Sequence, residues 1–172
     1  MKNKQSFRKD NKGLSLIEII IVLAIMSIIG GAFLLTTSIA TDKQVSSCAE
    51  KLVSSLEQTR NLAMGKQSGF IEVWKTAGGS VYCRMTIDGQ YYGSDASGIA
   101  IGHSALSVEV TEAGSPANVY DLNGHTARIE FSRSNGSVSS TPAVTQIKIT
   151  NGRRTVIVYI DKFTGRVYSE KV

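Results

Sequence analysis

The hydrophobic positions of this chain follow one pattern in the N-terminal third and another in the remainder. An almost unbroken apolar run, LSLIEIIIVLAIMSIIGGAFLL, begins at residue 14, and Glu18 is its only ionisable residue. About 21 residues from Ile19 would form a helix of roughly 31 Å, which matches the hydrocarbon core of a bilayer. The pattern therefore predicts a single membrane-spanning helix within residues 14–40.

Beyond residue 40 the apolar residues recur at helical spacing, while Lys43, Glu50 and Lys51 lie off the apolar face. The apolar face consists of Val45, Ala49, Leu52, Val53, Leu56 and Ala63. We expect an amphipathic helix over residues 41–66 that continues the membrane helix. Two separate helices, broken near Gly30 or Thr41, are the alternative.

Residues 67–172 alternate between polar and apolar in the manner of strands. Strands are expected at residues 70–74, 80–87, 108–111, 127–131, 146–150, 155–160 and 166–169. Asn151-Gly152 predicts a tight turn and an antiparallel hairpin. The fold class is therefore α+β: a long N-terminal helix whose apolar stripe packs on an antiparallel β-sheet domain with one core.

Positive charge is concentrated in residues 1–13. The chain has 172 residues, a formal net charge of +5 and a pI near 9.3. Most of the excess comes from Lys2, Lys4, Arg8, Lys9 and Lys12 against Asp10. Because basic residues resist translocation, this block places the N-terminus in the cytoplasm and the chain after residue 40 outside. The basic pI is a sign of membrane topology and does not by itself indicate a nucleic-acid-binding protein.

The apolar segment fits three kinds of N-terminus. A cleavable secretory signal would end at Ser38-Ile39-Ala40, but its apolar region would be much longer than the usual 7–15 residues. A plain signal anchor would remain uncut, with Glu18 as a carboxyl group near the membrane interface. The third kind depends on the order of the residues around Gly13.

Lys12-Gly13, followed by Leu14 to Glu18 and an apolar helix, closely resembles the class III signal of type IV prepilins and type II secretion pseudopilins. The resemblance implies that a membrane prepilin peptidase/methyltransferase cuts between Gly13 and Leu14 and methylates Leu14. It also implies that Glu18, the fifth residue of the mature chain, neutralises the N-terminal amine of a neighbouring subunit. The implied partners are this peptidase, other pilins or pseudopilins of the same filament and, before assembly, membrane lipid.

Two further features bear on this resemblance. Many family members have a proline about twenty residues into the mature helix, where this chain has Leu34, Leu35 and Thr36; Gly30-Gly31 is then the candidate for local weakness or for close helix packing. The C-terminal segment that ends at Thr164-Gly165-Arg166 resembles the minor pseudopilins typified by general secretion protein H and FimT. The resemblance implies a minor structural subunit of a pilus or pseudopilus, which reaches the surface filament from the cytoplasmic membrane and needs no cofactor.

The sequence contains little that points to catalysis. His103 and His125 are isolated and lack the spacing of metal ligands, so we expect no catalytic residue and no metal. A nucleophile made of Cys83 and either histidine has no supporting motif. Cys48 and Cys83, the two cysteines, fit either a disulfide in an exported domain or two buried free thiols.

DNA binding during uptake is a second class of function, suggested by basic residues near the C-terminus. They are Lys148, Arg153, Arg154, Lys162, Arg166 and Lys171. Such residues in turns can hold a phosphate backbone, and Arg153, Arg154 and Arg166 are the candidates for this patch. Asp161 and Glu170 are interleaved with them, which favours ordinary surface charge. An exported protein on a plain signal anchor is the remaining alternative.

Overall fold

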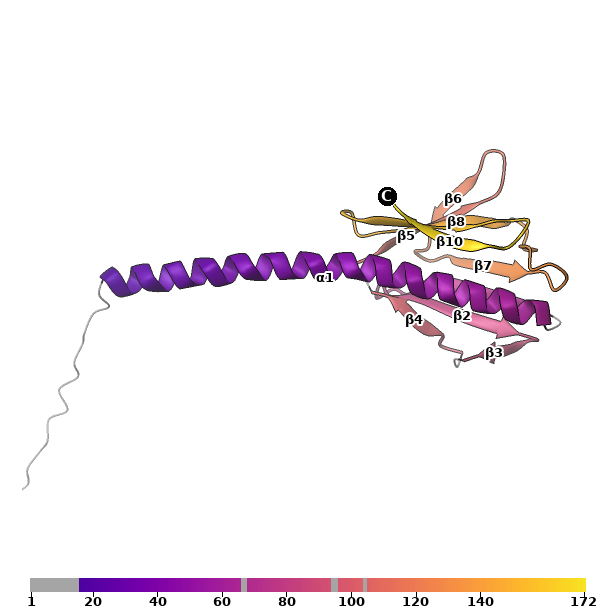
Figure 1. The fold of residues 1–172 in the computed structure, drawn as a ribbon, viewed down its shortest axis with the longest axis horizontal. Coiled ribbons are helices and arrows are strands. Elements are labelled where there is room, and N and C mark those ends of the chain that lie inside the picture. The colour runs from indigo at the N-terminus through magenta and orange to yellow at the C-terminus, as the bar shows by residue number, and fades with distance from the viewer. Residues whose placement is uncertain (1–15, 66–67, 94–95, 104) are drawn as a thin grey trace, which may run out of the picture. The chain divides into compact units, whose positions relative to one another are not determined.

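The computed structural model describes most of the chain. The described residues are 16–65, 68–93, 96–103 and 105–172, and among them the side chains of residues 32–40 are left out. The chain divides into two compact units, Met1–Ser38 (the first unit) and Ile39–Val172 (the second unit). Figure 1 shows one helix followed by strands, which confirms the α+β class.

Helix α1 runs from Leu16 to Gly65 and contributes residues to both units. The expected helix is therefore confirmed over the residues described. Gly30 and Thr41, where the alternative with two helices placed a break, are both α-helical.

The helix of the first unit presents a continuous apolar surface. From Leu16 to Ile29 every large apolar side chain is between 47% and 78% exposed. Its polar Ser27 is satisfied internally, because its hydroxyl donates to the Leu23 carbonyl oxygen at 2.8 Å. Soluble proteins rarely leave so continuous an apolar surface exposed, and surfaces of this kind are typical of contacts with other proteins or with a membrane. Among the described residues, no helix combines the length and the apolarity needed to cross a membrane.

In the second unit α1 buries one face. The buried residues of this face are Val45, Cys48, Ala49, Leu52, Leu56, Thr59 and Ala63. The Thr59 hydroxyl donates to the Ser55 carbonyl oxygen at 2.7 Å, so the polar group on this face has a partner. Burying a leucine side chain such as Leu52 or Leu56 contributes about 1.5–3 kcal/mol. The predicted apolar face is thus the face that docks on the sheets.

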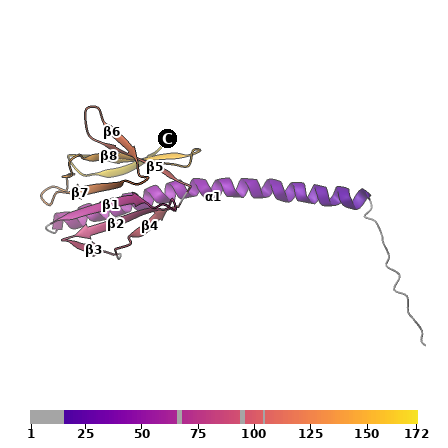
Figure 2. The same ribbon diagram turned by 180° about the vertical axis from the view of Figure 1, so that it is seen from behind.

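The buried face of α1 packs against two antiparallel five-stranded sheets (Figure 2). The first sheet has the order β3 (Gln90–Tyr92), β2 (Val81–Ile87), β1 (Gly69–Lys75), β7 (Thr126–Phe131), with β4 (Ile99–Gly102) also paired to β2. The second sheet has the order β10 (Val167–Lys171), β9 (Thr155–Ile160), β8 (Val144–Thr150), β5 (Ser107–Glu112), β6 (Asn118–Asp121). One core joins them, because buried residues of α1 and of both sheets form a single cluster.

The predicted strands all occur, but the sequence prediction missed β3, β4 and β6 and expected one sheet where there are two. The missed strands have three or four residues each and lack a full buried-exposed alternation. The hairpin of β8 and β9 is confirmed, with Thr150 opposite Thr155 and Gly152 at a φ of +84°.

Candidate functional site

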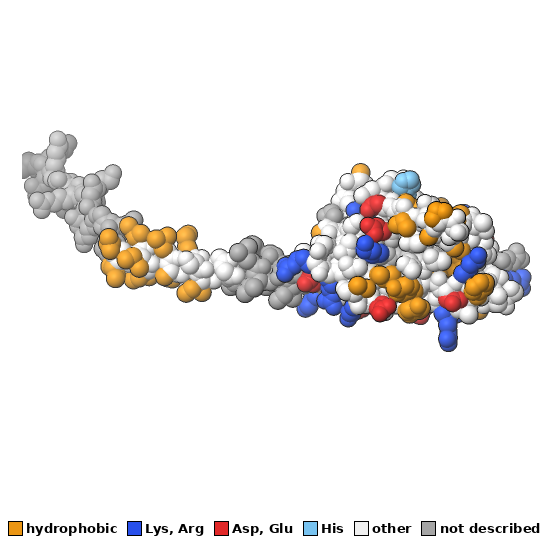
Figure 3. Space-filling model, turned by 90° about the horizontal axis from the view of Figure 1, so that it is seen from above, with side chains coloured by type: hydrophobic (Ala, Val, Ile, Leu, Met, Phe, Trp, Pro, Cys, Tyr) orange, Lys and Arg blue, Asp and Glu red, His pale blue; other side chains and the backbone are white. Residues whose placement is uncertain are grey.

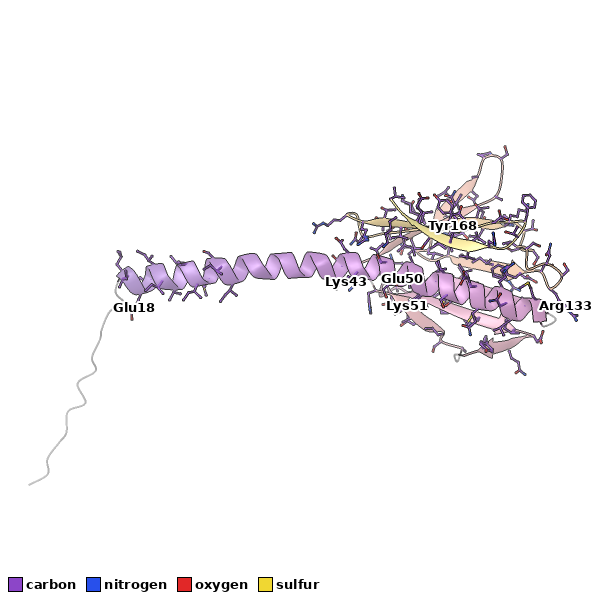
Figure 4. All side chains as sticks on the ribbon, viewed as in Figure 1. Glu18, Lys43, Glu50, Lys51, Arg133 and Tyr168 are labelled. Atoms are coloured by element: carbon purple, nitrogen blue, oxygen red, sulfur yellow. The ribbon has the colours of Figure 1, made fainter. Side chains whose placement is uncertain are left out.

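Glu18 lies in the first turn of α1 and is the only ionisable residue of the described first unit. Figure 4 labels it near the start of the helix. It lines a shallow, otherwise apolar hollow with Ile19, Val22 and Leu23. The partial positive charge of a helix N-terminus favours a carboxylate in this turn. The expected cleavage residues, Gly13 and Leu14, lie outside the described residues.

The Arg60 junction, made of Arg60, Gly136, Thr164 and Gly165, fastens α1 to two turns of the second unit. Arg60 Nε donates to the carbonyl oxygens of Gly136 at 3.3 Å and Thr164 at 3.1 Å. Gly165 is buried at a φ of +63°, and a Cβ there would overlap the Gly136 carbonyl oxygen. The Thr164-Gly165 sequence, noted above only by resemblance, therefore has a structural reason: only glycine fits where the two turns meet under Arg60.

Asp161 orders the turn that leads into this junction. Its Oδ1 accepts hydrogen bonds from the backbone N–H of Thr164 at 2.7 Å and of Phe163 at 2.9 Å, and from the Thr164 hydroxyl at 2.9 Å. The bonds from Thr164 contribute most, and together these contacts hold the pKa of Asp161 below its usual range. Asp161 is therefore more than an interleaved surface charge: its carboxylate shapes the β9–β10 turn.

Cys48 and Cys83 are both free and buried, so the structure contains the free thiols and not the disulfide. Burial, and next the nearby Cys83, raise the pKa of the Cys48 thiol to about 12. Burial also raises the pKa of Cys83, although its hydrogen bond to the Ser55 hydroxyl, at 3.7 Å, acts in the opposite direction. Both thiols therefore stay neutral at physiological pH and act as core side chains.

The two histidines lie at the surface, whereas Cys83 is buried. His103 is exposed, and the exposed His125 has its ring 5.5 Å from the Tyr120 ring. A nucleophilic cysteine needs an accessible thiol with a lowered pKa, whereas the Cys83 thiol is buried and its pKa is raised. Within the described ranges, no group of three or more His, Cys, Asp or Glu side chains is arranged to hold a metal ion.

The three arginines suggested for DNA binding do not form one cluster. Arg153 and Arg154 lie in the β8–β9 turn, whereas Arg166 lies in the β9–β10 turn and lines a surface hollow with Glu57 and Tyr168. The six residues of β9 separate these turns by about 20 Å. The basic cluster seen in the sequence is therefore divided between opposite ends of the second sheet.

A network around Arg84 on the outer face of the first sheet was not predicted. Arg84 donates to Glu72 Oε2 at 2.6 and 3.2 Å and to the Ala96 carbonyl oxygen at 2.7 Å. Its guanidinium also lies 5.4 Å from the Trp74 ring and 4.7 Å from the Tyr91 ring. These contacts attach the β3–β4 loop to the sheet.

Comparison with known families finds one match, at the N-terminus. Residues 8–34 match the family described as the prokaryotic N-terminal methylation motif. The match includes Gly13, Leu14 and Glu18 and leaves the second unit uncovered. Comparisons with curated proteins and with solved structures found no match. The match therefore supports, for the N-terminal segment, the resemblance to type IV prepilins and pseudopilins.

Proposed function

We propose that this chain is a minor structural subunit of a type IV pilus or a type II secretion-like pseudopilus, cut after Gly13 and assembled through its N-terminal helix. The exposed apolar surface from Leu16 to Ile29, directly after the processing motif, carries the proposal. An apolar surface of this kind is expected to be shielded from water by another molecule. Lipid would shield it in the precursor, and the helices of neighbouring subunits would shield it in the filament.

The proposed organisation has four parts. Residues 1–13 form a basic leader that is removed, and residues 14–40 form the helix that spans the membrane and later lies in the filament core. Residues 41–66 form the amphipathic helix, and residues 67–172 form the β-rich domain outside the cell membrane. The basic leader supports a cytoplasmic N-terminus. The packing of α1 on both sheets within the second unit supports one outer domain.

Glu18 is proposed to provide the charge match during assembly. An acid among apolar side chains is costly unless it is neutralised or paired. Cleavage after Gly13 creates a methylated amine at Leu14, which is a cation. In a filament the Glu18 carboxylate of one subunit would pair with the Leu14 amine of its neighbour.

The minor class is supported by the resemblance at Thr164-Gly165-Arg166. DNA uptake receives no geometric support, because Arg166 is far from Arg153 and Arg154. The plain signal anchor accounts for the apolar helix but not for the match over residues 8–34.

Glu18→Gln tests this function, with Ser27→Ala as a matched polar change on the same helix. Both variants would be produced with the matching peptidase and the other subunits, and filaments would be sheared and analysed for this chain. We expect both to be processed, Ser27→Ala to enter filaments, and Glu18→Gln to remain in the membrane. Equal incorporation of Glu18→Gln and the unsubstituted chain would refute the charge match.

A further inference from the structure

The β8–β9 turn lies against the first turns of α1 in the second unit. Asn151 Nδ2 donates to Asp42 Oδ1 at 3.0 Å. The Asn151 Oδ1 accepts from the backbone N–H groups of Arg153 at 3.0 Å and Arg154 at 2.8 Å. One amide side chain therefore fixes the shape of the turn and attaches it to the helix.

Four cations, here called the basic end, gather around this attachment. The basic end consists of Lys43, Arg153, Arg154 and Lys171. Lys43 follows Asp42, and Lys171 pairs with Val156 just after the turn. Figures 3 and 4 show Lys and Arg side chains, Lys43 among them, at the end of the second unit where its helix begins. Asp42 and Glu170 are the acidic residues next to them in the sequence, and Asn151 engages Asp42.

The cations of the basic end differ from those on the sheets. Arg84, Arg128 and Lys148 each form a salt bridge across or along the strands. No member of the basic end forms a salt bridge with a residue in the described ranges. Lys43, Arg153 and Lys171 are exposed as well. Their charge is therefore available to an anionic partner outside the chain.

The short distance in sequence between Lys43 and the proposed membrane span indicates which anionic partner this is, and this step rests on the proposed function. Lys43 comes three residues after residue 40, the proposed end of the membrane span, which is about 5 Å along a helix. Lysine and arginine side chains reach that distance and bind phosphate strongly, with arginine able to donate two parallel hydrogen bonds. Each cation held near an anionic bilayer strengthens binding about fivefold.

We propose that the basic end binds the anionic phospholipid headgroups of the membrane in which the unassembled subunit is inserted. The contact holds the second unit against the bilayer surface until the subunit is extracted into the filament. The surface is compact and lies at one end of the second unit, which suits a headgroup layer beside the span. Arg166, the third arginine suggested for DNA binding, lies at the other end of β9.

The test uses the full chain in vesicles, with a fluorophore on a cysteine that replaces Val172, which is 77% exposed and donates its N–H to the Thr155 carbonyl oxygen. A second labelled protein replaces Phe163, which is 80% exposed in the β9–β10 turn. Cys48 and Cys83 are buried and should not react with the dye. A quencher attached to lipid headgroups reports how close each label lies to the membrane surface.

We expect the label at position 172 to be quenched about twofold or more strongly in vesicles with about 30% anionic lipid than in zwitterionic vesicles. Salt at about 0.5 M should remove the difference. Arg153→Glu with Arg154→Glu should abolish it, whereas the same charge change at the far end, Lys162→Glu with Arg166→Glu, should not. The label at position 163 should not respond to anionic lipid.

An inserted chain whose label at position 172 is quenched equally in both kinds of vesicle would overturn the inference and leave the proposed function intact. The same holds if Arg153→Glu with Arg154→Glu leaves quenching unchanged but removes binding of a DNA duplex, since the basic end would then be assigned to DNA. A chain that alkaline washing strips from the vesicles would instead count against the proposed function.

Discussion

Gly165→Ala should destabilise the second unit far more than a surface turn substitution. The new Cβ would overlap the Gly136 carbonyl oxygen and approach Arg60 Nε, which donates to both neighbouring turns. The alanine would also have to adopt a φ near +63°. The substitution therefore tests whether the helix and the two turns meet as closely as the Arg60 junction indicates.

The magnitude has two parts. Placing alanine in the left-handed region costs about 1–2 kcal/mol. Moving the Gly136 carbonyl weakens the two Arg60 hydrogen bonds, which contribute about 1 kcal/mol each because Arg60 is only partly buried. We expect the free energy of unfolding to fall by about 3–4 kcal/mol. Gly152→Ala is the matched control, because Gly152 has a φ of +84° but no atom within 4 Å of an added Cβ.

The measurement is urea unfolding of the full chain in detergent, followed by the fluorescence of Trp74, the single tryptophan. Gly152→Ala should lose only about 1–2 kcal/mol, so the difference between the two variants isolates the close approach at about 2 kcal/mol. If Gly165→Ala loses no more than Gly152→Ala, the reasoning about the junction is wrong.

Further substitutions test the core, the outer network and the thiols. Leu56→Ala should lower the free energy of unfolding by about 3–4 kcal/mol, while Glu57→Ala on the exposed face should change it by less than about 0.5 kcal/mol; equal effects in urea unfolding would contradict the docking of α1. Arg84→Lys keeps the charge but loses the paired hydrogen bonds and ring contacts, so limited proteolysis should cut the β3–β4 loop faster, and an unchanged cutting rate would count against the network. Because the pKa of the Cys48 thiol rises from 9.0 to about 12 on folding, the unfolded chain loses this proton first, and stability should fall as pH rises from about 9 to about 12. Cys48→Ala should flatten this decline in pH-dependent unfolding, and an identical slope would exclude the thiol as its source.

Elements with a strong local period could be predicted from the sequence. Val45, Leu52 and Leu56 repeat at helical spacing, and the strands that alternate over five or more residues were found. The short strand β3 was missed because all three of its residues are exposed and its position depends on pairing with β2. The division into two sheets likewise depends on which strands pair, which the local pattern does not contain.

The candidate sites also differ in whether a local sequence pattern could predict them. Gly13, Leu14 and Glu18 are close together in the sequence, so their motif could be recognised directly and the family match agrees with it. The Arg60 junction joins residues 76 and 104 positions apart, which no local pattern predicts. The separation of Arg153 from Arg166 was hidden for the opposite reason: the residues are near in sequence, but a whole strand keeps them apart.

The sequence contains an alternating pattern from which the Arg84 network could have been predicted. Glu72 and Trp74 alternate on β1, and Tyr82 and Arg84 alternate on β2. Pairing these strands as a hairpin brings Glu72 opposite Arg84 and Trp74 opposite Tyr82. Cross-strand pairing of this kind predicts side-chain contacts once the register is known.

The most direct test of the central claim is the intact mass and N-terminal sequence of the protein recovered from cells that contain the matching prepilin peptidase. The account predicts a chain that starts at Leu14 and carries one methyl group on its amine. An uncut chain would make the segment a plain signal anchor. A chain that starts just after Ala40 would make it a cleaved secretory signal, and either result would contradict assembly through the N-terminal helix.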